Sequence, residues 1–215
     1  MKRNICRVAA LLVFMSTLEA QALKKVEGTE KFQEMTLTQT VELEEFEQVK
    51  LKSVGHALRN KKVAFMDFKV YVVELLMPVD ASWNQKAADF VTASPSGIQM
   101  SFLRDVPADK MMAAFSESLK ANQVDTKSEP VQAFINAVKK VGDLKNKDVF
   151  LIARKKSDKT DSVLLLIPGR AKEIISGPAG WSDGIMKIWA GKAADQDSRK
   201  CKRNCLSNNS FCISE

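Results

Sequence analysis

Histidine and tyrosine are almost absent from this sequence: among 215 residues there is one of each, His56 and Tyr71. A single histidine leaves no Ser–His or Cys–His pair in a recognisable context, so the sequence gives no support for nucleophilic catalysis. Three of the four cysteines, at 201, 205 and 212, have the spacing C-x3-C-x6-C, but a zinc site needs a fourth ligand and His56 is far away in sequence. We therefore expect no metal and no cofactor.

Long hydrophobic runs are also missing. The one extended apolar stretch, residues 8–17, is about half the roughly 20 residues that a membrane-spanning helix needs. It follows a short basic segment and precedes a small-x-small pattern that ends at Ala22, an arrangement typical of a secretory signal peptide. We expect residues 1–22 to be removed by cleavage after Ala22, and the mature protein to be periplasmic or secreted without a transmembrane segment.

Acidic residues are outnumbered: 26 Asp and Glu face 33 Lys and Arg, for a formal net charge of +7 at pH 7. Part of the excess lies in a basic C-terminal tail, residues 199–215, which contains Cys201, Cys205 and Cys212. Such a tail can bind phosphate groups or an anionic surface, but a solvated terminus explains the same residues, and we favour that interpretation. One disulfide could form among the three cysteines, and the sequence does not choose the pair. No nucleic-acid-binding module is recognisable.

Hydrophobic periodicity divides the rest of the chain into strands, helices, strands and a last helix. A charged, loose lead-in is expected at residues 23–34, followed by three strands in an antiparallel meander. The predicted strands cover 35–45, 46–55, 63–77, 98–105, 147–155, 162–169 and 171–176, and the predicted helices cover 80–93, 106–122, 128–142 and 181–192. This order predicts an α+β fold built on an antiparallel sheet, in a single domain spanning residues 23–198.

Two local patterns add detail to this prediction. The uninterrupted apolar run Val163–Ile167 indicates a strand that is buried on both faces. Asp105 precedes the second predicted helix, and we interpret it as the N-terminal cap of that helix and not as a catalytic acid.

Arg59 and Tyr71 stand near the two ends of a segment that could face a pocket. Strand alternation puts Tyr71 on one face with Val73 and leaves Glu74 on the other. If helices cover the first face, the Tyr71 hydroxyl needs a polar partner, and a guanidinium in the same space would itself need an anion such as a carboxylate. The alternative is that Arg59 points to water, which its residue type alone favours. His56 could be a general base, but an isolated histidine is more often structural.

Four segments in this order resemble the chalcone isomerase-like family. They are VGHALRNKKVAFMDFKVYVVELL at 54–76, MSFLRDVPADKMMAAFSESLK at 100–120, VLLLIPG at 163–169 and GIMKIWAGKAADQ at 184–196. The first is the most specific, because Gly, Arg and Lys precede a KVYV strand. The resemblance extends over about residues 50–198 and is closest to the exported bacterial branch of that superfamily.

The resemblance implies an open-faced β-sandwich, in which a layer of helices covers a large antiparallel sheet and a ligand cleft lies between them. In the plant isomerases, the arginine of the first motif polarises the substrate ketone or binds its phenolate. In fatty-acid-binding relatives, an arginine and a tyrosine hold the ligand carboxylate. Arg59 matches that arginine, and Tyr71 has a spacing that suits the tyrosine.

Other positions depart from the isomerases. Where those enzymes carry three polar groups that bind the flavonoid, this sequence has Asp109, Ser116 and Ile188, so we do not expect chalcone cyclisation. We expect a non-catalytic exported protein that binds a small apolar ligand with an acidic head group, a fatty-acid-like carboxylate or a phenol, through Arg59 and Tyr71. Two alternatives stay open. One is an intramolecular lyase or isomerase acting on an enone or phenol. The other is an envelope scaffold for protein interaction, whose cleft would be filled by side chains such as Met111, Phe115 or Trp189.

Overall fold

Eight strands form one antiparallel sheet in the order of the sequence. The computed structural model describes residues 23–63, 65–84 and 86–192. The strands are β1 (Lys24–Phe32), β2 (Met35–Leu43), β3 (Val49–Val63), β4 (Met66–Pro78), β5 (Ser96–Phe102), β6 (Val149–Lys156), β7 (Thr160–Ile167) and β8 (Ala171–Pro178), and each pairs with the next. The predicted α+β class and the antiparallel sheet are confirmed.

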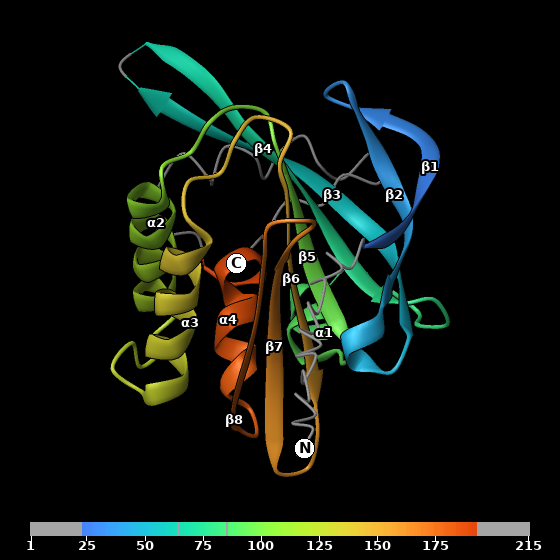
Figure 1. Cartoon of the computed structure of the whole chain (residues 1–215), viewed down its shortest axis with the longest axis vertical. Helices are drawn as coiled ribbons and strands as arrows, with labels where there is room; N and C mark the ends of the chain where they lie inside the picture. Colours follow the sequence, from blue (N-terminus) through green and yellow to red (C-terminus); the bar gives the residue numbers. More distant parts are fainter. Residues whose placement is uncertain (1–22, 64, 85, 193–215) are drawn as a thin grey trace, which may run out of the picture.

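A layer of helices covers one face of this sheet. It contains α1 (Ala87–Thr92), α2 (Ala108–Ala121), α3 (Glu129–Val141) and α4 (Trp181–Ala190), while a 3-10 turn, η1 (Glu44–Phe46), joins β2 to β3. Figure 1 shows α2, α3 and α4 side by side against the end of the sheet formed by the later strands. In the described part of the chain, no helix combines the length and the apolar character that crossing a membrane requires.

The main hydrophobic core lies between the sheet and the helices. Val73 and Leu75 of β4 face it, together with Ile98 and Met100 of β5, and all four are buried. The two-residue period of the strands therefore sets the inward face as predicted. Apolar residues of α2, α3 and α4 close the other side of this core, at the helical spacing of an amphipathic face.

A second, smaller core lies on the opposite face of the sheet. Leu164 and Leu166 of β7 pack there against Val41, Leu43 and Phe46, although β2 and β7 are far apart in the order of strands. The sheet therefore curls until β2 and η1 cover the back of the later strands, as strand twist allows. This explains why every residue of the run Val163–Ile167 is buried, as predicted.

Ion pairs hold η1 in place over the later strands. The Lys172 ammonium of β8 lies 3.1 Å from the Glu45 carboxylate, and the Lys155 ammonium of β6 lies 2.8 Å from that of Glu47. The face that the fold class would leave open is thus partly closed by the chain's own N-terminal strands.

Two element predictions were wrong. Residues 23–34 form no loose lead-in but the edge strand β1, whose many charged residues are typical of an exposed edge and hide its period. The helix predicted at 80–93 begins only at Ala87. Trp83 still reaches the core from the extended segment before it, where its ring packs edge-on against Phe90 at 6.3 Å.

The prediction that Asp105 caps α2 was also wrong. The first backbone N–H of α2, that of Ala108, donates instead to the Asp143 carboxylate at 3.0 Å. Asp105 accepts a hydrogen bond from the backbone N–H of Asn146 at 2.9 Å. The predicted signal peptide, residues 1–22, lies outside the described residues, as does the tail 199–215.

Candidate functional site

Arg59 and Tyr71 lie directly opposite each other on the neighbouring strands β3 and β4. Residues paired in this way on antiparallel strands project from the same face of a sheet and are close enough to interact. Tyr71 is half-buried and packs against the main core, with its ring 5.4 Å from that of Phe102. Arg59, which is also half-buried, therefore projects from the helix-covered face.

The pair lies at the rim of the helical layer. β5 pairs with β4 only as far as Tyr71, which is opposite Phe102, the last residue of β5. A register shift follows Arg59, so that the next pair along the hairpin is Asn60 with Lys69. Such bulges change the direction of side chains at the end of a pairing region. Arg59 and Tyr71 thus mark the boundary between the covered sheet and a hairpin that continues beyond it.

Side chains fill the main core behind this rim. Met111 and Phe115 of α2 and Trp189 of α4 are all buried. The Phe115 ring packs edge-on against that of Trp189 at 5.1 Å and stacks on that of Phe134 at 6.0 Å. The indole N–H of Trp189 is buried and has no acceptor among the described residues. A buried donor of this kind normally has a partner, so an oxygen atom brought by water or by a ligand would satisfy it.

His56 and Glu74 form part of a polar cluster on the other face of β3 and β4. The Glu74 carboxylate accepts hydrogen bonds from the backbone N–H of Thr38 at 2.7 Å and from the Gln99 side chain at 2.8 Å. His56 is opposite Glu74 across the strands, and its ring lies 4.5 Å from that of Phe32. Both are buried, and alternation directs them away from the face of Arg59. This packing supports the structural interpretation of His56.

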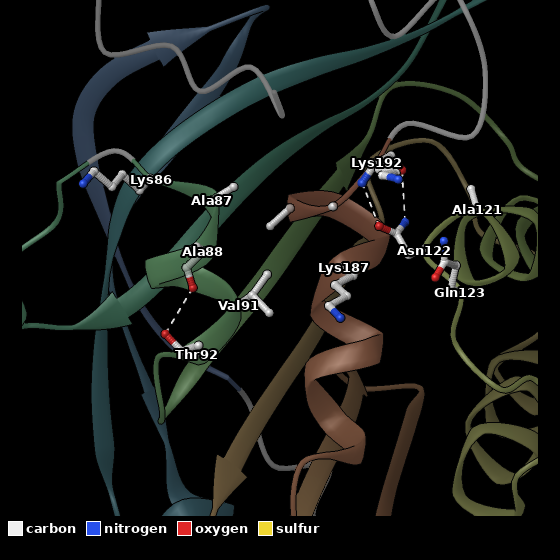
Figure 2. Close-up of a pocket in the computed structure, with 12 residues that line it drawn as sticks. Lys86, Ala87, Ala88, Val91, Thr92, Ala121, Asn122, Gln123, Lys187 and Lys192 are labelled. Atoms are coloured by element: carbon white, nitrogen blue, oxygen red, sulfur yellow. Dashed lines mark hydrogen bonds between the residues drawn. The ribbon is translucent and has the colours of Figure 1, made fainter. Parts of the chain in front are cut away.

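A groove of about 700 Å³ lies between α1, the end of α2 and the end of α4. Figure 2 shows α1 on one side of the groove and α4 on the other. Three lysines line it, Lys86, Lys187 and Lys192, along with small apolar residues of the helices. The described residues that line this groove include neither Arg59 nor Tyr71, so the groove is a second place where an anionic group could bind.

Asn122 fixes the end of the groove. Its side chain accepts a hydrogen bond from the backbone N–H of Lys192 at 2.7 Å and donates one to the carbonyl of the same residue at 3.0 Å. These bonds are visible in Figure 2. A side chain at Gly191 would come within 2.0 Å of the Asn122 amide oxygen, so only glycine permits this approach. The end of α4 is therefore tied to the end of α2.

Sequence reasoning missed the most deeply buried cation, Arg154 of β6. Its side chain has no exposed surface. It donates to the Asp183 carboxylate of α4 at 2.5 Å, to the Ser96 hydroxyl at 2.9 Å, and to carbonyl groups at the end of α1, those of Phe90, Val91 and Ala93. Burial lowers the pKa of the Arg154 guanidinium, while the charges of Asp183 and Asp161 act in the opposite direction. Arg154 joins α1 and α4 to the sheet.

The three positions that depart from the isomerases lie in different surroundings. Asp109 is exposed and forms a surface ion pair with Lys110, while Ile188 packs against the main core. Ser116 is half-buried on α2. Among the described residues, no three His, Cys, Asp or Glu side chains come together as metal ligands would.

Comparison with known proteins agrees with this architecture. The model of the chalcone isomerase-like family matches residues 29–202, which is most of the chain. The chain belongs to the chalcone isomerase-like family. A search of the curated proteins finds no match for this family member. Among solved structures, it is similar to the fatty-acid binding protein of Arabidopsis thaliana, with 10% sequence identity and a TM-score of 0.48, over 82% of this chain and 94% of that one.

The ligand site was predicted from the segment at 54–76, which contains Arg59 and Tyr71 and resembles a motif of the chalcone isomerase-like family. The structure brings the two residues together on one face of the sheet. Their contact with a ligand stays a prediction.

Proposed function

We propose that this chain is a non-catalytic chalcone isomerase-like protein, exported from the cell, that binds a small apolar ligand with an acidic, fatty-acid-like head group. One observation carries the proposal: the guanidinium-bearing Arg59 and the hydroxyl-bearing Tyr71 are directly paired at the rim of the main core. An arginine and a neighbouring hydroxyl form a suitable pair of donors for a carboxylate. The apolar tail would then enter between the sheet and α2.

The ligand tail would displace side chains that now fill the core. Met111 is the most adaptable of these, because an unbranched thioether side chain repacks easily.

The first test is native mass spectrometry of the chain expressed with its leader in an exporting bacterium and purified from the periplasm. A bound fatty acid or other carboxylate, identified after denaturing extraction, is the expected result. Arg59→Ala and Tyr71→Phe should weaken binding of that ligand, by about 10- to 100-fold for the arginine, because a hydrogen bond to a charged group is lost. Arg170→Ala, on the turn between β7 and β8, is a matched control that should keep full affinity.

Lys187→Met distinguishes the rim from the groove between α1 and α4. This variant should bind as the unmodified protein does if the carboxylate lies at Arg59. Loss of binding in Lys187→Met with full binding in Arg59→Ala would move the ligand to the groove.

The scaffold alternative has an observation of its own in its favour. Met111, Phe115 and Trp189 leave the space between the sheet and the helices filled by side chains. A protein that carries no adduct under gentle ionisation, and that gains no thermal stability from added fatty acids, would support this alternative over ligand binding.

A further inference from the structure

Beyond the pair of Arg59 and Tyr71, β3 and β4 continue as a two-stranded ribbon. The paired residues run from Asn60 with Lys69 to Val63 with Met66. Among the described residues, β2 pairs with β3 only as far as Lys52, and β5 pairs with β4 only from Tyr71 onward. Figure 1 shows this hairpin reaching past the helical layer, away from the rest of the molecule. We call the described residues of this ribbon, 60–63 and 65–69, the hairpin tip.

The hairpin tip exposes two large apolar side chains. Phe65 is 98% exposed and Met66 is 61% exposed, the two highest values among the exposed large hydrophobic residues of the described chain. An isolated two-stranded hairpin has marginal stability in water. Moving an apolar side chain out of water is favourable, because it lowers the free energy. The described residues, 23–63, 65–84 and 86–192, do not cover these two side chains, so a surface outside this part of the chain is the natural partner.

Cations surround this apolar end. Lys61 and Lys69 are exposed on the two strands of the tip, and the guanidinium of Arg104 lies 4.8 Å from the centre of the Phe68 ring. Residues 59–69 contain four basic residues and one acid, Asp67. Apolar side chains that enter the acyl region and basic side chains that remain at the level of the phosphates are the two features of peripheral binding to an anionic bilayer.

The small size of the apolar surface favours a lipid partner over a protein. A stable protein interface buries about 800 Å² on each partner, more than two side chains on a ribbon supply. A bilayer needs no matching surface, because apolar insertion and attraction of basic residues to anionic lipids add up. Lysine and arginine side chains also extend far enough to keep their charges in the headgroup region.

We propose that the hairpin tip docks this protein on an anionic lipid bilayer, with Phe65 and Met66 inserted below the headgroups and Lys61, Lys69 and Arg104 among the phosphates. This inference stands apart from the proposed ligand, because it needs no ligand at Arg59. It would also place the rim of the helical layer next to the membrane.

Co-sedimentation with lipid vesicles tests the docking. The mature chain should bind vesicles of phosphatidylcholine mixed with phosphatidylglycerol, bind vesicles of phosphatidylcholine alone much more weakly, and dissociate at high salt. The double variant Phe65→Ser with Met66→Ser should lower the partition coefficient by about tenfold or more. Lys61→Gln with Lys69→Gln should lower it by roughly 25-fold, at about fivefold for each basic residue near the surface.

Two control variants have matched chemistry elsewhere on the molecule. Ile174→Ser removes another half-exposed apolar side chain, on β8, and Lys120→Gln with Lys139→Gln removes two exposed lysines of the helical layer. Both should partition as the unmodified chain does. All the substituted side chains are solvent-exposed, and circular dichroism will verify that each variant is folded.

A direct probe of depth completes the test. In Phe65→Trp, the added indole should show a blue-shifted emission with anionic vesicles and quenching by lipids brominated in their acyl chains. The proposal is overturned if the unmodified chain fails to bind anionic vesicles at low salt, or if the controls lose as much binding as the tip variants. It is also overturned if light scattering shows a dimer that the Phe65→Ser, Met66→Ser variant abolishes, since the tip would then be a contact between two copies.

Discussion

Arg154 and Arg59 both project from the helix-covered face of the sheet, but they lie in different surroundings. Arg154 is fully buried under α1 and α4, where a carboxylate, hydroxyl groups and helix-end carbonyls accept its hydrogen bonds. Arg59 is half-buried at the rim, where the hairpin leaves the helical layer. A buried cation is tolerated only with this kind of complete partnership, so Arg154 has a structural role. The rim is where a cation can also meet a molecule from outside.

The largest effect on stability is expected from replacing Arg154, the buried arginine. Arg154→Met removes the cation and leaves the carbonyls of α1 without their donor, while the Asp183 carboxylate keeps only its ion pair with Lys156. We expect the free energy of unfolding to fall by about 3–5 kcal/mol, measured by urea denaturation. If that variant does not fold, Asp183→Asn serves instead and should be destabilised by a smaller amount. A cost of the same size for Arg59→Met would remove the distinction between the two arginines.

The second largest effect on stability is expected from the polar cluster around Glu74, on the face of β4 opposite to Tyr71. The Glu74 carboxylate accepts from the Thr38 backbone and hydroxyl and from Gln99. Glu74→Gln would place an amide N–H against one of these donors, so we expect a loss of about 1–3 kcal/mol of stability. Glu117→Gln, at an exposed position on α2, is the matched control and should be near neutral. Equal stability of the two variants would show that the hydrogen bonds of Glu74 do not contribute to the free energy of unfolding.

Arg59→Ala should change stability least among the buried and half-buried changes. We expect the ligand-free protein to lose less than about 1 kcal/mol, because the side chain lies at the rim and not in the core. The same variant should lose the thermal stabilisation that a bound carboxylate gives the unmodified protein. A large loss of stability with full retention of ligand stabilisation would instead make Arg59 structural, like Arg154.

Sequence patterns indicated a role for Arg59 but not for Arg154, for a physical reason. Alternation along β4 places Tyr71 and Val73 on the core face, so the face of the motif was visible from a period of two. Arg154 precedes Lys155 and Lys156, and a basic run at the end of a strand is typical of a solvated surface. Its acceptors come from α1, some sixty residues earlier, and from α4, nearly thirty residues later. Long-range partners of this kind leave no local pattern.

The same distinction separates the parts of the fold that were predicted from those that were not. Strands and helices with one apolar face were found, because burial repeats at a fixed spacing. The edge strand β1 was missed, since its charged residues carry no such repeat. The cap of α2 was assigned to the adjacent Asp105, whereas the structure supplies it from Asp143, beyond the end of α3. Local propensity alone favours the nearer residue.

The smallest effect is expected from the pH dependence of a contact near the rim. Asp105 follows Arg104, whose guanidinium packs on the Phe68 ring of the hairpin. The Asp105 carboxylate accepts a hydrogen bond from the backbone N–H of Asn146, and this bond ties its loop to the segment before β6. This hydrogen bond, with Lys145, lowers the pKa of the Asp105 carboxyl below its ordinary value of 3.8. Its folded pKa is therefore lower than its unfolded pKa. The stability that it contributes is present above the unfolded value and is lost as the pH falls through the folded one.

Asp105→Asn removes that dependence. Urea midpoints measured between about pH 5 and about pH 3 should decrease less steeply for the variant than for the unmodified chain, while the two should keep a nearly constant difference at higher pH. The change will be small, because the carboxylate is exposed and solvent screens its interaction with Lys145. A variant with an unchanged slope would mean that the loop is held by packing alone. In that case, the charged groups near Arg59 would differ from those around Arg154 in exposure but not in the hydrogen bonds that hold them.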